Sequence, residues 1–118
     1  MKRLIRAFLL TATSAFSGSI DIDKLGTLVD YRIAAAAHVD GSFDGADYDK
    51  PVLLDNGWLF KFRAYHYSYA YRPAAIVLVK LTTADELRRM GLKPISEAPL
   101  ATYKLIIDDD VYDVSRVR

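Results

Sequence analysis

The chain has 118 residues, of which 52% are hydrophobic and 26% charged, and its formal net charge at pH 7 is +1. This length suits one globular domain with its own core, so we expect a single domain over residues 1–118. A charge so close to zero argues against a protein that binds nucleic acid by bulk charge alone. The absence of cysteine excludes a disulfide scaffold, zinc–thiolate sites and a cysteine nucleophile.

The first residues have some features of a secretory signal, because Lys2 and Arg3 precede an apolar run. Arg6 and several hydroxyl residues interrupt this run, and it is too short and too polar to span a bilayer. We therefore predict neither a signal peptide nor a membrane partner. Apolar residues recur on one helical face, namely Leu4, Ile5, Phe8, Leu9, Ala12, Ala15 and Phe16. Residues 1–17 are predicted to form an amphipathic helix that packs on its own domain or docks on a neighbouring chain.

The next segments are read as a connection followed by a strand. Ser19–Gly26 is predicted to be a short connection with an extended piece at Ile20–Ile22. Residues 28–39 fit two patterns: four consecutive alanines favour a helix, whereas apolar residues at alternate positions favour a strand. Because the alternation covers the whole length, we predict a strand.

Residues 40–50 are rich in Asp and Gly and predict a loop. Asp40, Ser42 and Asp44 have the spacing that opens an EF-hand calcium loop. Pro51 stands where the closing glutamate would be, and no paired helices flank the loop. We expect a solvated loop without a metal or cofactor, with calcium binding at Asp40, Ser42 and Asp44 as the alternative.

Asn56-Gly57 lies between two apolar runs and predicts a two-residue hairpin turn, since both residues tolerate positive φ. This turn would pair Leu54 with Leu59 and Leu53 with Phe60. The second arm of the hairpin then opens a long aromatic stretch that runs to Arg72.

The aromatic stretch alternates with period two, which indicates a strand, but fourteen residues of strand would be unusually long. One interpretation places a bulge near Ala64, so that the large rings before and after it share a core face. These rings belong to Trp58, Phe60, Phe62, Tyr65, Tyr67, Tyr69 and Tyr71. The other keeps the strand straight, so that the tyrosines are exposed beside Lys61 and Arg63. We favour the core reading. A mixed arrangement, with core at Trp58–Phe62 and a contact surface at Tyr67–Arg72, is also compatible with the sequence.

If the tyrosines are exposed, they form a candidate interaction surface, because a tyrosine ring buries area while its hydroxyl keeps a polar partner. The residues of this surface are Lys61, Arg63, Tyr65, Tyr67, Tyr69, Tyr71 and Arg72. The same set could also stack single-stranded nucleic acid.

The C-terminal half is predicted to contain three strands and one helix. Residues 74–81 are almost continuously apolar, as in a strand covered on both faces. Thr82 or Thr83 can cap a short helix over residues 84–90 that stops at Gly91. Residues 102–107 and 111–117 form a closing hairpin around Asp108–Asp110. The predicted fold class is therefore α+β, mainly antiparallel β.

No set of residues identifies a reaction. His38 and His66 stand alone in the sequence, and no glycine-rich phosphate loop or nucleophile motif is present. We therefore expect a protein without catalytic activity.

The hairpin from Tyr103 to Val117, with its acidic turn followed by Tyr112-Asp113-Val114, resembles the closing hairpin of small head-to-tail connector proteins of tailed phages. The resemblance covers about fifteen residues. It implies a non-enzymatic β-rich subunit that forms rings in the virion. Basic and acidic segments that alternate along the chain agree with head-to-tail stacking of copies.

From these features we expect an assembly protein that binds its own copies and other assembly proteins. The alternative is a small regulatory protein, either a phage-encoded inhibitor of a host protein or a nucleic-acid binder. The location would be the virion if the resemblance holds and the cytoplasm otherwise.

Overall fold

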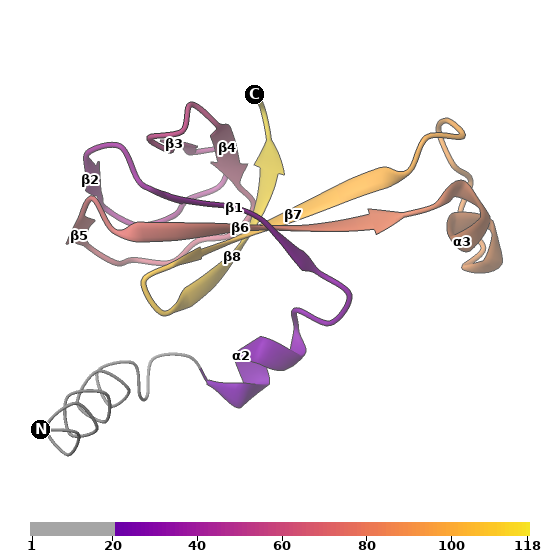
Figure 1. The fold of residues 1–118 in the computed structure, drawn as a ribbon, viewed down its shortest axis with the longest axis horizontal. Helices are drawn as coiled ribbons and strands as arrows, with labels where there is room; N and C mark the ends of the chain where they lie inside the picture. The colour runs from indigo at the N-terminus through magenta and orange to yellow at the C-terminus, as the bar shows by residue number, and fades with distance from the viewer. Residues whose placement is uncertain (1–20) are drawn as a thin grey trace, which may run out of the picture.

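The computed structural model describes residues 21–118, and their main element is one curled antiparallel sheet (Figure 1). Its strand order is β1-β6-β7-β8-β4-β3. The strands are β1 (Arg32–His38), β3 (Pro51–Leu53), β4 (Leu59–Phe62), β6 (Ala74–Thr82), β7 (Leu100–Ile107) and β8 (Asp110–Arg116). Two more strands, β2 (Ser42–Phe43) and β5 (Ala70–Tyr71), form a separate pair, and two short helices complete the fold: α2 (Ile22–Gly26) and α3 (Ala84–Arg89). The predicted fold class is confirmed, whereas the helix predicted over residues 1–17 lies outside the described residues.

The two edges of the sheet meet at one end. Val39, just after β1, forms an antiparallel bridge with Leu54, just after β3. The amide of Asp40 donates to the carbonyl of Leu53, and the amide of Asp55 donates to the carbonyl of His38, both at 2.9 Å. The curled sheet therefore encloses a core. Its largest fully buried side chains are Phe60, Phe62, Leu54, Leu105, Ile107 and Val77.

Strands β6 and β7 continue past the rest of the sheet as a two-stranded arm. The pairing of β1 with β6 ends at Val79, and that of β8 with β7 ends at Tyr103, but β6 and β7 stay paired as far as Thr82 and Leu100. Figure 1 shows this arm projecting from the body with α3 at its end.

The helix on the arm confirms the prediction for residues 84–90. The Thr83 hydroxyl accepts from the amide of Glu86 and donates to its carboxylate, each at 3.2 Å, which is a capping interaction. The chain turns out of the helix at Gly91, whose φ of +80° suits glycine.

The Asn56-Gly57 hairpin is present, but the predicted register is wrong by one residue. Leu53 pairs with Leu59 and Val52 pairs with Phe60. Only Gly57 has a positive φ, at +89°, and its amide donates to the carbonyl of Leu54 at 3.0 Å. The turn is therefore a three-residue loop with a glycine bulge instead of a two-residue turn, and the extra residue shifts the pairing.

The segment before β1 also differs from the prediction. Residues 22–26, which the sequence predicts as part of a connection, form a helix, because the Asp21 side chain accepts from the amide of Asp23 at 3.2 Å and caps it. The strand predicted over residues 28–39 is confirmed only from Arg32 to His38. Turns and a positive φ of 68° at Asp30 occupy the residues before it.

The closing hairpin is confirmed, although β7 begins two residues earlier than predicted and β8 is shifted by one residue towards the N-terminus. Ile107 pairs with Asp110, so the turn itself consists of Asp108 and Asp109. Asp108 adopts φ +54°, a conformation that aspartate tolerates better than most residues. Asp110 therefore belongs to β8, and its side chain is free to contact other elements.

Candidate functional site

The four tyrosines after β4 are exposed, so the prediction that they belong to the core is wrong. Phe60 and Phe62 are buried, but the chain leaves the sheet after Phe62, and no bulge brings the tyrosines inward. The exposed fractions of Tyr65, Tyr67, Tyr69 and Tyr71 are 66%, 75%, 66% and 71%. This burial pattern agrees with the mixed arrangement considered from the sequence, whereas the role of Tyr67–Arg72 as a contact surface stays a prediction.

The small residues between the tyrosines explain this outcome. Ala64, Ser68 and Ala70 are half-buried because the stretch runs beside residues 41–46. The amide of Ala46 donates to the carbonyl of His66 at 2.8 Å, and the amide of His66 donates to the carbonyl of Ala46 at 3.0 Å. Small inward side chains allow this close approach, and the large rings consequently point to solvent.

Gly45 is required at this contact. Its φ is +101°, and a Cβ there would lie 2.7 Å from the carbonyl oxygen of His66. A second anchor lies at the far end, where the amide of Arg72 donates to the carbonyl of Gly41 at 2.9 Å. The backbone that carries the tyrosines is therefore held at both ends, which lowers the entropy cost of binding through them.

All seven predicted surface residues are exposed, and we call this set the tyrosine surface: Lys61, Arg63, Tyr65, Tyr67, Tyr69, Tyr71 and Arg72. Nearby carboxylates partly neutralise the two arginines of this surface. Arg63 Nη1 lies 3.3 Å from Asp49 Oδ1, and Arg72 Nη2 lies 3.8 Å from Asp55 Oδ2. The tyrosine surface is thus more aromatic than cationic, and phosphate contacts would have to compete with these carboxylates.

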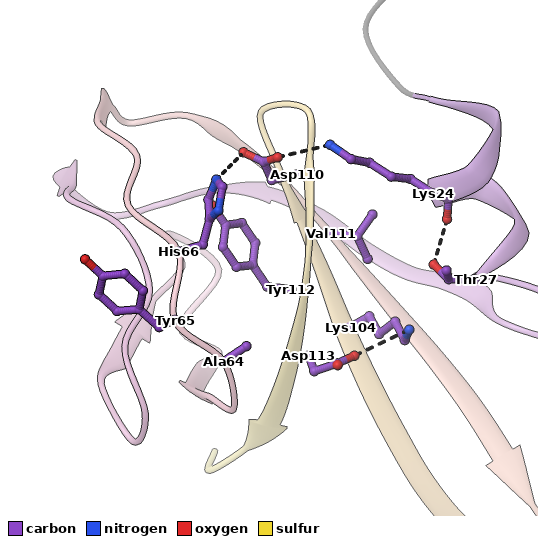
Figure 2. Close-up of a pocket in the computed structure, with 10 residues that line it drawn as sticks. All are labelled: Lys24, Thr27, Ala64, Tyr65, His66, Lys104, Asp110, Val111, Tyr112 and Asp113. Carbon is purple, nitrogen blue, oxygen red and sulfur yellow. Dashed lines mark hydrogen bonds and ion pairs between the residues drawn. The ribbon is translucent and has the colours of Figure 1, made fainter.

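A cleft of about 450 Å³ adjoins one end of the tyrosine surface (Figure 2). Its walls come from α2, from residues 64–66 and from the β7–β8 hairpin. The residues that line it are Lys24, Thr27, Ala64, Tyr65, His66, Lys104, Asp110, Val111, Tyr112 and Asp113. Tyr65 belongs to both regions, and His66 of the cleft lies between Tyr65 and Tyr67 in the chain, so a partner on the tyrosine surface can reach into the cleft.

Asp110 is the central charged group of the cleft. Its Oδ2 atom lies 3.3 Å from His66 Nε2, and its Oδ1 atom lies 3.2 Å from Lys24 Nζ, as the dashed lines in Figure 2 show. These two contacts join three separate elements, namely α2, the tyrosine-bearing segment and β8. Sequence reasoning missed this cluster because its members are 44 and 42 positions apart and no short motif contains them.

Tyr112 forms part of the cleft wall and is almost fully buried, with 3% of its surface exposed. Its ring contacts the rings of Phe43, Phe62 and His66. The hydroxyl has no hydrogen-bond partner among the described residues. Burial, together with the charges of Asp110 and Asp108, raises the pKa of Tyr112 to about 12.

The groups of the cleft differ in the contacts that they leave open. His66 and Asp110 form a pair like that of a histidine and its orienting carboxylate. The Thr27 hydroxyl donates to the carbonyl of Lys24 at 2.6 Å, and the Tyr112 phenol is buried. The cleft offers charged and aromatic contacts to a ligand or a protein side chain.

The alternative calcium ligands Asp40, Ser42 and Asp44 line one small pocket of about 110 Å³ together with Lys50. Asp44 contacts the Lys50 ammonium, which holds the pKa of that carboxyl below its ordinary value. Ser42 belongs to β2, where it pairs with Tyr71. Within residues 21–118, no group of three His, Asp or Glu side chains is placed to hold a metal ion. The loop over residues 40–50 instead supports the segment that bears the tyrosines.

No helix within the described part of the chain is long and apolar enough to cross a membrane. Comparisons with protein-family models, with curated proteins and with solved structures gave no match to this chain.

Proposed function

We propose that this protein is a non-catalytic assembly protein that binds other protein subunits through the tyrosine surface. The observation that carries the proposal is the series Tyr65, Tyr67, Tyr69 and Tyr71, each at least 66% exposed, on a backbone that is anchored at both ends. Aromatic rings are enriched at the centres of protein interfaces, where they supply much of the binding energy. Leaving four of them in water has no benefit to folding, so a partner that covers them is the simplest explanation.

The tyrosine surface has the composition of an interface between proteins. Its rings supply apolar area, its hydroxyls can form hydrogen bonds at the rim, and Arg63 and Arg72 can exchange Asp49 and Asp55 for carboxylates of a partner. The partner includes further copies of this chain in our proposal. A ring subunit, such as the head-to-tail connectors of tailed phages, is the specific form that the resemblance of the Tyr103–Val117 hairpin supports.

A second candidate function is binding of single-stranded nucleic acid. Tyrosines at alternate positions of an extended chain lie roughly 7 Å apart, a spacing that lets successive bases stack on them. Lys61, together with Arg63 and Arg72, would contact the phosphates. The carboxylate partners of both arginines make this candidate second to protein binding.

The solution mass of the protein, measured at low and at high salt, tests the proposal. We expect a complex of several chains that persists at high salt, because aromatic contacts depend little on ionic strength. A protein that stays a single chain at both salt concentrations, and that binds a single-stranded oligonucleotide only at low salt, would refute the assembly function and support the second candidate.

A further inference from the structure

The end of the β6–β7 arm carries an apolar groove of about 290 Å³, formed by α3 and the loop that follows it. Its lining consists of Leu87 and of every residue from 92 to 100 except Glu97. Leu87 is buried, whereas Leu92 and Leu100 are 53% and 51% exposed and Ile95 is fully exposed. We call this site the arm groove. It leaves several large apolar side chains in contact with water.

The arm groove has a restricted backbone. The amide of Leu92 donates to the carbonyl of Leu87 at 2.9 Å, which ties the start of the loop to α3. Pro94 and Pro99 each fix φ at one position of the loop. Such a site loses little conformational entropy when a partner binds, which makes the arm groove suitable for docking.

The free charge of the arm groove is positive. Lys93 is exposed and is the one charged residue in the lining. None of the ion pairs within residues 21–118 includes Lys93. Glu97 belongs to the same loop, but its carboxylate is paired with Arg88. An apolar groove beside an unpaired ammonium group is complementary to a partner that carries apolar side chains next to carboxylates.

The tyrosine surface of another copy does not match this requirement. Its own charged residues are Lys61, Arg63 and Arg72, and the carboxylates near it are already paired with the two arginines. Figure 1 also shows β5, where the run of tyrosines ends, and α3 on opposite sides of the sheet along the long axis of the view. The arm groove and the tyrosine surface can therefore hold different partners at the same time.

We propose that the arm groove binds an acidic amphipathic segment of a different protein. The segment places a few apolar side chains against Leu92, Ile95 and Leu100, and one of its carboxylates pairs with Lys93. The volume of the groove is at the lower end of the roughly 300–1,000 Å³ that is usual for small-molecule sites, and it suits a few side chains of a partner. This docking site is independent of the function proposed for the tyrosine surface.

Selection from a display library of random peptides, with the full chain as the target, tests the proposal. We expect the enriched peptides to combine large apolar residues with nearby aspartate or glutamate. They should not bind Ile95→Glu, which places a carboxylate at the groove. The Ile95 side chain is fully exposed, so this variant should keep the wild-type melting temperature. No enrichment, enriched peptides without carboxylates, or equal binding to Ile95→Glu would overturn the proposal.

Fluorescence anisotropy with one enriched acidic peptide measures the role of the lysine. Lys93→Glu should weaken the affinity about tenfold or more, because it replaces an attractive contact with a repulsive one. Lys61→Glu makes the same change of charge at an exposed residue of the tyrosine surface, and it should change the affinity by less than about twofold because distant charges are screened. Equal losses in the two variants would mean that the peptide does not bind at the arm groove.

The solution mass distinguishes a different protein from a second copy as the occupant. We expect Ile95→Glu to have the same mass as the wild-type chain. A lower mass would show that another copy occupies the arm groove, and the assignment to a different protein would be wrong. A change of mass in variants of Tyr67 and Tyr69 concerns the tyrosine surface alone, so the two proposals can fail separately.

Discussion

Tyr112 shows how one buried hydroxyl affects this core. The ring fills space between Phe43 and Phe62, but its hydroxyl has no partner among the described residues. A buried hydroxyl without a partner has lost its hydrogen bonds to water and forms none within the protein, which lowers stability. The residue therefore contributes to stability through its ring and lowers stability through its oxygen.

Tyr112→Phe is expected to raise the free energy of unfolding by about 1 kcal/mol at neutral pH, because it removes only the unsatisfied oxygen. Chemical denaturation of both proteins measures this difference. A loss of stability of similar size would show that the hydroxyl has a favourable partner, and the packing account of this residue would be wrong.

Tyr112→Phe should also change how the free energy of unfolding depends on pH. The pKa of Tyr112 is raised from 10.0 to about 12 in the folded protein, so folding disfavours the ionised phenol. The resulting contribution to stability is complete below pH 10 and is lost as the pH rises from 10 towards 12. The wild-type protein should therefore lose more stability over this range than Tyr112→Phe. Equal losses in both proteins, measured by denaturation at each pH, would contradict the assignment.

Gly45 and Gly41 form a matched pair at the segment that supports the tyrosines. Both have a positive φ, but a Cβ would meet the backbone of His66 only at Gly45. We expect Gly41→Ala to cost about 1–2 kcal/mol, and Gly45→Ala to cost roughly 3 kcal/mol or more. Denaturation curves of the two variants provide the comparison. Equal costs would mean that residues 64–68 can move away without penalty.

At the scale of elements, Asp110 connects α2, the tyrosine-bearing segment and β8. The side chains of Lys24 and His66 are 43% and 52% exposed, so water screens both ion pairs. Such pairs contribute little to global stability. Their effect should instead be local, because each holds a short segment against the sheet.

Asp110→Ala is therefore expected to lower the free energy of unfolding by about 1 kcal/mol or less, and to increase hydrogen exchange clearly in residues 22–30 and 63–69. Asp113→Ala is the control, because Asp113 lines the same cleft but pairs with Lys104 at 3.4 Å. Exchange that rises equally in both variants, or in neither, would show that Asp110 does not position these segments.

Local signals in the sequence predicted the elements that depend on them. Asn56-Gly57, the Thr83 cap and the acidic turn at Asp108 each determine their own turn or helix end, and all three were located correctly. The register at Asn56-Gly57 was wrong because the choice between two and three loop residues depends on φ at Asn56, which the sequence does not show. The helix α2 was missed because five residues are too few for a hydrophobic period to appear.

The position of the tyrosines depended on tertiary structure instead. The aromatic alternation changes parity near Ala64, but this change does not reveal that the chain exchanges one neighbour, β8, for another, residues 41–46. The charged cluster around Asp110 was equally hidden, since Lys24 and His66 are distant in sequence. Local conformation could be predicted from the sequence, whereas contacts between segments that are distant in the chain could not.

The molecule as a whole has a closed core and, outside it, surfaces on which large side chains are exposed. The tyrosine surface lies beside the charged cleft, and the β6–β7 arm carries further exposed apolar residues such as Leu92 and Ile95. The arm offers a comparison for the tyrosine surface, because both expose large side chains outside the core. Of these two surfaces, the tyrosine surface alone combines several rings with a backbone anchored at both ends.

The central claim is that the tyrosine surface joins subunits and does not support the fold. Its most direct test is the solution mass of a variant that combines Tyr67→Ser with Tyr69→Ser, compared with a control that combines Leu92→Ser with Ile95→Ser. We predict that the tyrosine variant keeps the wild-type melting temperature within a few degrees but falls to the mass of a single chain, while the control keeps the wild-type mass. A tyrosine variant that retains the wild-type mass, or one that fails to fold, would contradict this account.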